Sequence, residues 1–155
     1  MMPYLKSIYV LLIDSINENS LDTNCLLASL SRRSPYFNVW GALQKGEYTL
    51  CVSNEILDEY EEIISMKTNS LIASNVIQTI INCPNVELID PHFQFYLVKE
   101  DVDDNKFVDC AIVANATFIV SNDRHFNSLK ECDFPKIDVK RIEEFSKMLS
   151  STSFF

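Results

Sequence analysis

Glycine is nearly absent from this 155-residue sequence, with two residues, and proline occurs only five times. So little of either excludes collagen-like and low-complexity chains, and an apolar content of 47% is enough for one globular domain with a buried core. No apolar run approaches the roughly 20 residues that a membrane-spanning helix needs. The run IYVLLI at 8–13 is also too short for a signal-peptide core and has no small-residue cleavage site after it. We therefore expect a single domain over residues 1–155, cytoplasmic and not inserted in a membrane.

Closely spaced cysteines and histidines are missing as well. The five cysteines are scattered and odd in number, and His92 and His125 are the only histidines. This pattern argues against a disulfide framework, a zinc site, histidine-based metal binding and a histidine-driven triad. Basic residues are also few, and the formal charge of −9 disfavours a broad basic face for nucleic-acid phosphates. A nucleic-acid substrate would have to be reached through a divalent metal ion and a local set of Lys and Arg.

Short apolar runs alternate with helical patterns along the chain. We predict strands at 8–13, 48–53, 86–90 and 117–121, helices at 35–45, 54–68, 70–83 and 104–116, a polar turn at 14–20, a short helix within 21–30, and a last strand and helix within 137–149. This alternation predicts an α/β class, a three-layer α/β/α fold with a mostly parallel central sheet of about five strands. In such sheets the functional groove lies at the carboxyl ends of the strands.

Helical geometry, at about 100° per residue, separates the carboxylates of helix 104–116. Asp104 falls on the apolar face that also holds Phe107 and Ala111, whereas Asp109 points off that face and Lys106 lies on the opposite side. An acid in the first turn can simply favour the positive end of the helix dipole. It can equally point into the groove and bind a cation.

Helix 54–68 offers a second acid. Its apolar stripe consists of Ile56, Tyr60, Ile63, Ile64 and Met66. Glu59 projects between Ile63 and Met66, while Asp58, Glu61 and Glu62 project outward and are expected to be surface charges.

Two more acids lie at predicted strand ends. Asp123 follows strand 117–121, where an Asx-turn is the structural alternative, and Asp22 precedes a helix, where an N-cap is the alternative. Carboxylates from four segments at one rim would repel each other unless protons or cations neutralised them. Mg²⁺ and Mn²⁺ prefer oxygen ligands, so the pattern favours a divalent-cation site.

The segments LDTNCLLASL, VSNEILDEYEEI, DDNKFVDCAIVANATFIVSND and FPKIDVKRIEEF resemble a PIN domain. The resemblance is closest to the bacterial group of toxin components of toxin–antitoxin systems and covers about residues 8–149. It implies a small α/β/α fold whose acidic cluster binds Mg²⁺ or Mn²⁺ and supports RNA hydrolysis. It also implies a cognate antitoxin protein, and homodimers are common among similar proteins.

Carried over position by position, the resemblance implies that the catalytic, metal-binding acids are Asp22, Glu59, Asp104 and Asp123. Asn24 and Ser121 match the polar residues that accompany the acids. Asp109 matches a position that is often acidic, and its place on the helix makes it an outer residue of the site. Arg124 lies next to the last motif and is a candidate contact for RNA phosphates.

One departure concerns the first motif. In similar chains an apolar strand runs directly into Asp-Thr-Asn, but here the predicted strand 8–13 is separated from it by DSINENSL. Asp14 is therefore an alternative first acid, although Thr23 and Asn24 favour Asp22. Three hypotheses follow: a ribonuclease, a non-catalytic PIN-like binding module with a disabled site, and another metal-dependent phosphohydrolase. The last lacks an Asp-x-Asp-x-Thr motif.

Overall fold

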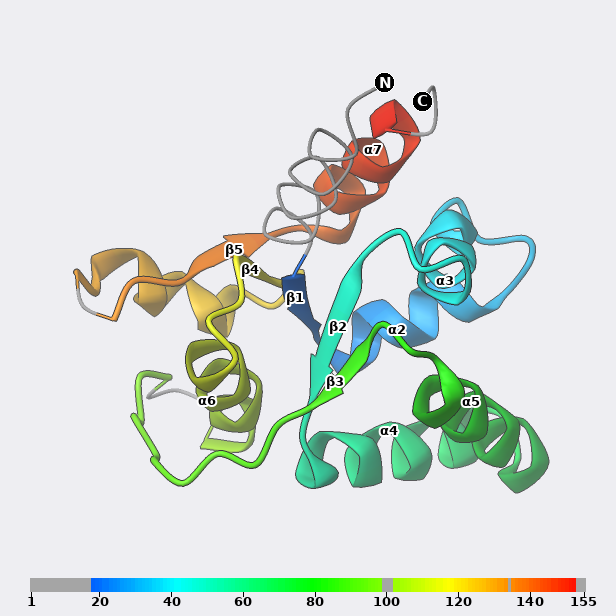
Figure 1. Ribbon diagram of the computed structural model, residues 1–155, viewed down its shortest axis with the longest axis horizontal. Helices are drawn as coiled ribbons and strands as arrows, with labels where there is room; N and C mark the ends of the chain where they lie inside the picture. The colour runs from blue at the N-terminus through cyan, green and yellow to red at the C-terminus, as the bar shows by residue number, and fades with distance from the viewer. Residues whose placement is uncertain (1–17, 99–101, 134, 153–155) are drawn as a thin grey trace, which may run out of the picture.

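A five-stranded, entirely parallel sheet forms the centre of the protein, in the strand order β3-β2-β1-β4-β5 (Figure 1). The structure is a computed structural model that describes residues 18–98, 102–133 and 135–152. The strands are β1 (Glu18–Leu21), β2 (Thr49–Val52), β3 (Val86–Leu88), β4 (Phe118–Val120) and β5 (Asp138–Lys140). The predicted α/β class and the five-stranded parallel sheet are confirmed.

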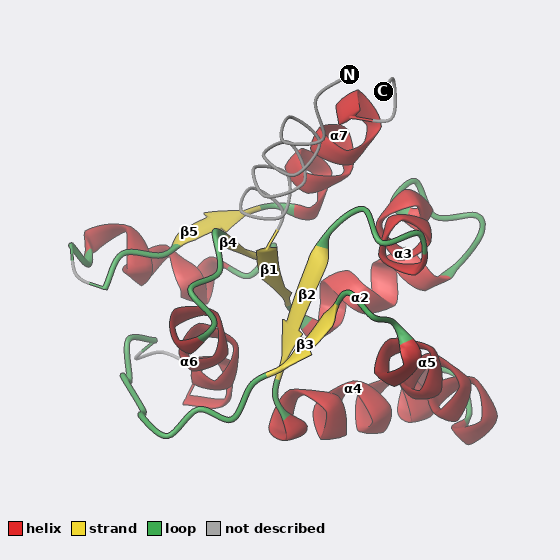
Figure 2. Ribbon diagram, viewed as in Figure 1, coloured by secondary structure: helices red, strands yellow, loops and turns green. Residues whose placement is uncertain are grey.

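Helices cover the sheet on both sides (Figure 2). They are α2 (Thr23–Leu30), α3 (Phe37–Gln44), α4 (Asn54–Lys67), α5 (Ser70–Asn82), α6 (Asn105–Val113) and α7 (Ile142–Thr152), with short 3₁₀ helices η1 (Val102–Asp104) and η2 (Arg124–Glu131). Helix α6 packs on β1, β2 and β4, whereas α3 packs against α2 and α7 on the other side. Among the described helices, none is long and apolar enough to cross a membrane.

The apolar core lies between these layers. On the side of α7, the ring of Phe145 lies 5.6 Å from Phe118 of β4 and 5.0 Å from Tyr48, edge to face in both cases. On the side of α6, Phe107 faces Tyr60 of α4 at 6.5 Å. These contacts hold α4, α6 and α7 against the sheet, and so they set where the side chains at its carboxyl edge lie.

The central strand, β1, is the main correction to the sequence analysis. The prediction of a polar turn over 14–20 is wrong for Glu18–Ser20, which pair with β2 and β4 in the middle of the sheet. Asn19 and Ser20 are fully buried in spite of their polarity. The strand predicted at 8–13 and Asp14 lie outside the described residues. Because β1 ends at Leu21, Asp22 follows a strand directly.

The apolar stripe predicted for α4 is also shorter than expected. Ile56, Tyr60 and Ile64 are fully buried, but Met66 is 71% exposed. Met66 lies in the last turn of the helix, beyond the part that packs on the core. The buried part of the predicted stripe therefore ends before Met66.

Candidate active site

The carboxyl ends of β1 and β4 bring Asp22 and Ser121 together. The backbone N–H of Asp22 donates to the carbonyl of Val120 at 3.0 Å, and the Ser121 hydroxyl donates to Asp22 Oδ2 at 2.8 Å. Asp22 stands at the N-cap position of α2 without a side-chain capping bond; its carboxylate accepts from Ser121 across the sheet edge, and the backbone N–H of Thr23 also lowers its pKa. The N-cap explanation for this acid is therefore not supported.

Asp22 is buried at a position where its charged form is disfavoured. The side chain is only 6% exposed. Burial raises the pKa of Asp22 above its ordinary value of 3.8, the Ser121 hydrogen bond opposes this, and the charges of Asp123 and Glu59 raise the pKa further. Asp22, Asp123 and Glu59, three of the four predicted acids, are thus close enough for their charges to interact.

Asp104, Asp123 and His125 form a close group at this edge. One ligand atom from each lies within 4.8 Å of the other two. His125 Nδ1 is 3.2 Å from Asp123 Oδ1 and 3.6 Å from Asp104 Oδ2. Two carboxylates and an imidazole suit a divalent cation such as Mn²⁺, while Mg²⁺ would rely on the carboxylates. The donor set therefore fits the kind of ion that the sequence predicts.

Local structure fixes Asp123 in place. Its backbone N–H donates to Ser121 Oγ at 3.0 Å, and its Oδ1 accepts from the backbone N–H of His125 at 2.9 Å as the N-cap of η2. The expected turn at Asp123 is present, and the same bonds aim its carboxylate at Asp104 and His125. The Asx-turn and the approach of the Asp123 carboxylate to Asp104 and His125 therefore occur together.

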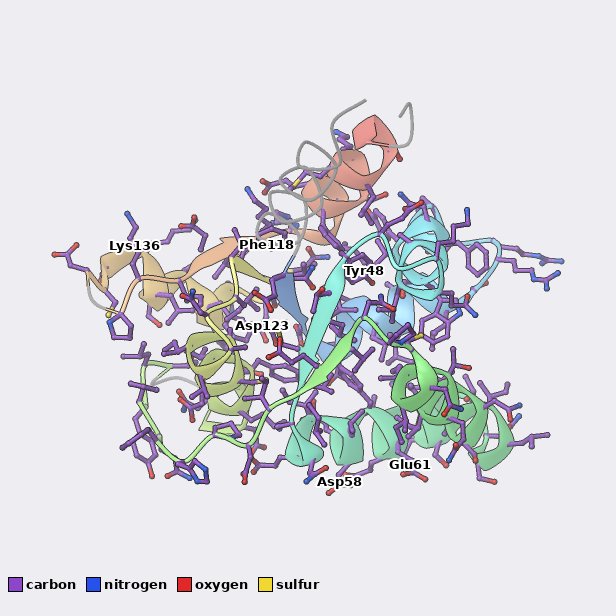
Figure 3. All side chains as sticks on the ribbon, in the orientation of Figure 1. Tyr48, Asp58, Glu61, Phe118, Asp123 and Lys136 are labelled. Atoms are coloured by element: carbon purple, nitrogen blue, oxygen red, sulfur yellow. The ribbon has the colours of Figure 1, made fainter. Side chains whose placement is uncertain are left out.

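Glu59 enters the same edge from α4. This helix starts directly after β2, where Ser53 Oγ caps the N–H of Ile56 at 3.2 Å. Glu59 Oε2 accepts a hydrogen bond from Thr23 Oγ1, and Oε1 lies 2.7 Å from Lys106 Nζ. Figure 3 shows Asp58 and Glu61 on the outer side of α4, and Asp123 near β1 toward the centre of the view. Asp58, Glu61 and Glu62 are exposed, as predicted.

A family model for the PIN domain matches residues 20–125, more than two thirds of the chain. The chain belongs to the PIN domain family. This confirms the resemblance at the level of the family. No curated protein matches the chain in sequence.

Two solved structures share the fold of this PIN domain. One is the crystal structure of VapBC2 from Rickettsia felis bound to a DNA fragment from its promoter. It is 20% identical with a TM-score of 0.53, over 79% of this chain and 97% of that one. PAE2754 from Pyrobaculum aerophilum is 13% identical with a TM-score of 0.57, over 90% of this chain and 93% of that one. At these identities the likeness concerns the fold.

The accompanying residues of the PIN domain are placed less uniformly than its acids. Ser121 is 2% exposed, and its hydroxyl donates to Asp22. Asn24 is exposed on α2, and it is the neighbouring Thr23 that contacts an acid. Arg124 is exposed on η2, where it lines a surface hollow with Asn127, Ser128 and Glu131.

Asp109 is buried, although the helix pattern pointed it away from the core. Its side chain is 6% exposed because the segment 93–98 lies over it, and Asp109 Oδ1 accepts from the backbone N–H of Phe95 at 3.1 Å. Burial raises the pKa of Asp109, the Phe95 hydrogen bond opposes this, and Glu55 raises it further. Asp109 lines a pocket with Glu55 and Tyr96, among others, and so lies beside the acid cluster rather than in it.

Three residues of the site were missed by the sequence analysis: Thr23, Lys106 and His125. Lys106 was placed on the side of the helix opposite the groove, which is wrong, because α6 packs beside α4 and the long side chain reaches Glu59. His125 follows Asp123 by two residues, a spacing that could have suggested a shared ligand group. Thr23 is part of the quoted Asp-Thr-Asn motif.

Proposed function

We propose that this PIN domain is an endoribonuclease that hydrolyses RNA phosphodiester bonds with a bound Mg²⁺ or Mn²⁺. The observation that carries the proposal is the grouping of Asp104, Asp123 and His125 within 4.8 Å, next to the buried carboxylate of Asp22. Carboxylates grouped in this way repel each other unless protons or cations neutralise them, and a divalent cation is the natural counter-charge for oxygen ligands. Phosphodiester hydrolysis is a reaction for which protein carboxylates and a divalent cation suffice.

The proposed role of each residue follows from its position. Asp104 and Asp123 would hold the ion, Asp22 and Glu59 would complete the acidic set, and His125 stands ready as a further ligand. Ser121 keeps the Asp22 carboxylate turned toward the site through its 2.8 Å hydrogen bond. The bound ion would supply Lewis-acid stabilisation of the developing charge and a lowered pKa for attacking water. Asn24, Asp109 and Arg124 would act outside this centre, on substrate or on pocket shape.

We further propose that the protein is the toxin of a toxin–antitoxin pair in the cytoplasm, with a cognate antitoxin protein and a homodimeric state. Support comes from the motifs that resemble the toxin group and from the fold shared with VapBC2. Induced expression of the wild type should stop cell growth, and the Asp104→Asn variant should not. Growth arrest by both proteins would contradict a toxin that acts through this site.

The rival hypotheses have less support. A disabled binding module was suggested by the polar segment between strand 8–13 and Asp22, but β1 ends directly before Asp22. The observation that suggested a disabled site therefore no longer favours the binding module. Nothing at the described strand ends favours the phosphohydrolase.

An RNA-cleavage assay with a matched charge control tests the proposal. Wild type should cut single-stranded RNA in Mn²⁺ or Mg²⁺ and lose this activity in a chelator. Asp104→Asn should cut on the order of a hundredfold more slowly or worse, as expected when a transition-state contact is removed. Asp58→Asn makes the same change on the outer side of α4 and should keep the wild-type rate. Cleavage in chelator, or equal rates for the Asp104 and Asp58 variants, would refute the nuclease.

The same assay decides the first acid. Asp14→Asn should retain cleavage and Asp22→Asn should lose it, because Asp22 is the carboxylate that meets Ser121, Asp123 and Glu59. The reverse result would assign the first acid to Asp14.

A further inference from the structure

The acid cluster contains a cation of the protein's own, Lys106. Its Nζ lies 2.7 Å from Glu59 Oε1 and donates to the backbone carbonyl of Asp103 at 2.9 Å. The side chains of Lys106 and Glu59 are 12% and 26% exposed, so the pair is largely shielded from solvent. Thr23 takes the other oxygen of Glu59. Both oxygens of the acid that should bind a metal ion are therefore already engaged by donors.

A divalent cation and an ammonium compete for Glu59. Two positive charges repel strongly at contact distance in a partly buried site. Binding of the ion to Glu59 is therefore more favourable when the Lys106 ammonium moves away. This conflict is visible in the structure alone, since the ion pair occupies the side of Glu59 that faces α6.

We propose that Lys106 is an exchangeable counter-ion: the incoming divalent cation displaces its ammonium from Glu59, and the freed ammonium then contacts a phosphate of the RNA. Lys106 is thus a positioning residue for the metal-free site and a substrate contact in the loaded one. The second half of the inference rests on the proposed function. The first half concerns the protein and the ion only.

The surroundings of Lys106 allow such a movement. Lysine is a compact charge on a flexible stem with rotatable donors, suited to a single phosphate. Nζ also lies 5.5 Å from the centre of the Phe107 ring, a cation–π contact that the ammonium would exchange together with its contact to Glu59. Lys106 also lines a pocket of about 230 Å³, whose wall includes Tyr96, and this gives the head room to leave Glu59.

Mn²⁺ titration calorimetry without RNA tests the exchange. Lys106→Met should bind Mn²⁺ about three- to tenfold more tightly than wild type, because an ion pair no longer has to be broken. Lys147→Met is the matched control, since Lys147 pairs with Glu143 at 3.2 Å on the exposed surface of α7, and it should match wild type. Lys106→Arg, which keeps the charge and can grip a carboxylate with two donors, should bind Mn²⁺ no more tightly than wild type.

Unchanged or weaker Mn²⁺ binding by Lys106→Met would overturn the exchange. Thermal melting checks that Lys106→Met folds. If it does not fold, Lys106→Gln repeats the calorimetry with a neutral polar side chain. A gain in affinity by Lys106→Arg equal to that of Lys106→Met would also overturn it, because then the charge is not what competes.

Salt dependence of RNA binding tests the phosphate contact. Anisotropy of a labelled single-stranded RNA would be measured in Ca²⁺, which uses the same oxygen ligands, and again in chelator, with the RNA checked for integrity. In Ca²⁺ the slope of log K against log salt should be smaller by about 0.7 for Lys106→Met than for wild type, which is the loss of one phosphate contact. In chelator the two slopes should agree, because the wild-type ammonium then stays on Glu59. Equal slopes in Ca²⁺ would overturn the phosphate contact.

The two experiments separate the inference from the proposed function. If no RNA binds or is cut, the ribonuclease proposal and the phosphate contact fail together. The calorimetry still decides whether Lys106 and the ion exchange at Glu59.

Discussion

Replacing Asp22 by Asn should raise the stability of the metal-free protein and lower that of the metal-loaded protein. Asp22 is 6% exposed, and burial together with the charges of Asp123 and Glu59 raises its pKa, against the Ser121 hydrogen bond. An Asn side chain removes the charge and keeps an oxygen for Ser121 Oγ. Relief of a charge conflict at a functional site typically adds about 0.5–2 kcal/mol to the free energy of unfolding.

The sign of the pH dependence follows from the raised pKa. Between the ordinary value of 3.8 and the higher folded pKa, the folded protein binds the proton and the unfolded chain does not. The cost of the Asp22 charge is therefore absent below 3.8, grows as the pH rises through this window and is complete above the folded pKa. The stability gain of Asp22→Asn should be present at pH 7 and vanish near pH 3.5.

Mn²⁺ should reverse the order of the two proteins. A ligand at a hundred times its dissociation constant stabilises the folded state by about 2.7 kcal/mol, and a variant that has lost a ligand gains less. Urea unfolding at pH 7 with and without Mn²⁺ measures both effects, with equal m values as the check on comparison. A variant that is less stable than wild type in chelator, or that gains as much from Mn²⁺ as wild type, would refute the argument that Asp22 is a buried, metal-directed charge.

Two further predictions concern residues that support the site. Tyr60 is fully buried and its hydroxyl donates to the carbonyl of Leu21, directly before Asp22, so Tyr60→Phe should lower the unfolding free energy by about 1–2 kcal/mol in urea titrations. A change of only a few tenths would mean that the hydroxyl does not hold the end of β1. Asn105 is 5% exposed and bonds both the N–H and the carbonyl of Val98 at 2.9 Å, so Asn105→Ala should cost about 2–3 kcal/mol and speed limited proteolysis within 89–98, whereas Asn127→Ala on the surface should not. Equal proteolysis of the two variants would show that Asn105 does not anchor this segment.

Most of the fold could be predicted because it depends on local pattern. The helix expected at 54–68 is α4 at Asn54–Lys67, and its start at Ser53 was set by an N-cap that the sequence itself carries. The apolar runs at 48–53 and 117–121 became β2 and β4 because short apolar segments between helices are buried wherever they occur. Their parallel arrangement then followed from the alternation of strands and helices.

The meeting of Asp22, Asp123 and Asp104 could be predicted for a related reason. Parallel strands place their carboxyl ends at one edge, where Asp22 and Asp123 follow β1 and β4, and Asp104 starts the helix that runs from this edge back to the beginning of β4. The distances within the group could not be predicted from the sequence. Nor could the hydrogen bond from Ser121, after β4, to Asp22, after β1.

Only the tertiary structure determined that Glu18–Leu21 is the central strand and that Lys106 lies in the site. The four residues of β1, ENSL, have little strand propensity of their own, and they are extended because β2 and β4 supply hydrogen bonds on both sides. Lys106 pairs with Glu59 across 47 positions because α4 and α6 pack side by side. Local patterns report which residues prefer burial, but strand partners and helix packing depend on contacts between segments far apart in the chain, and those contacts form only in the folded protein.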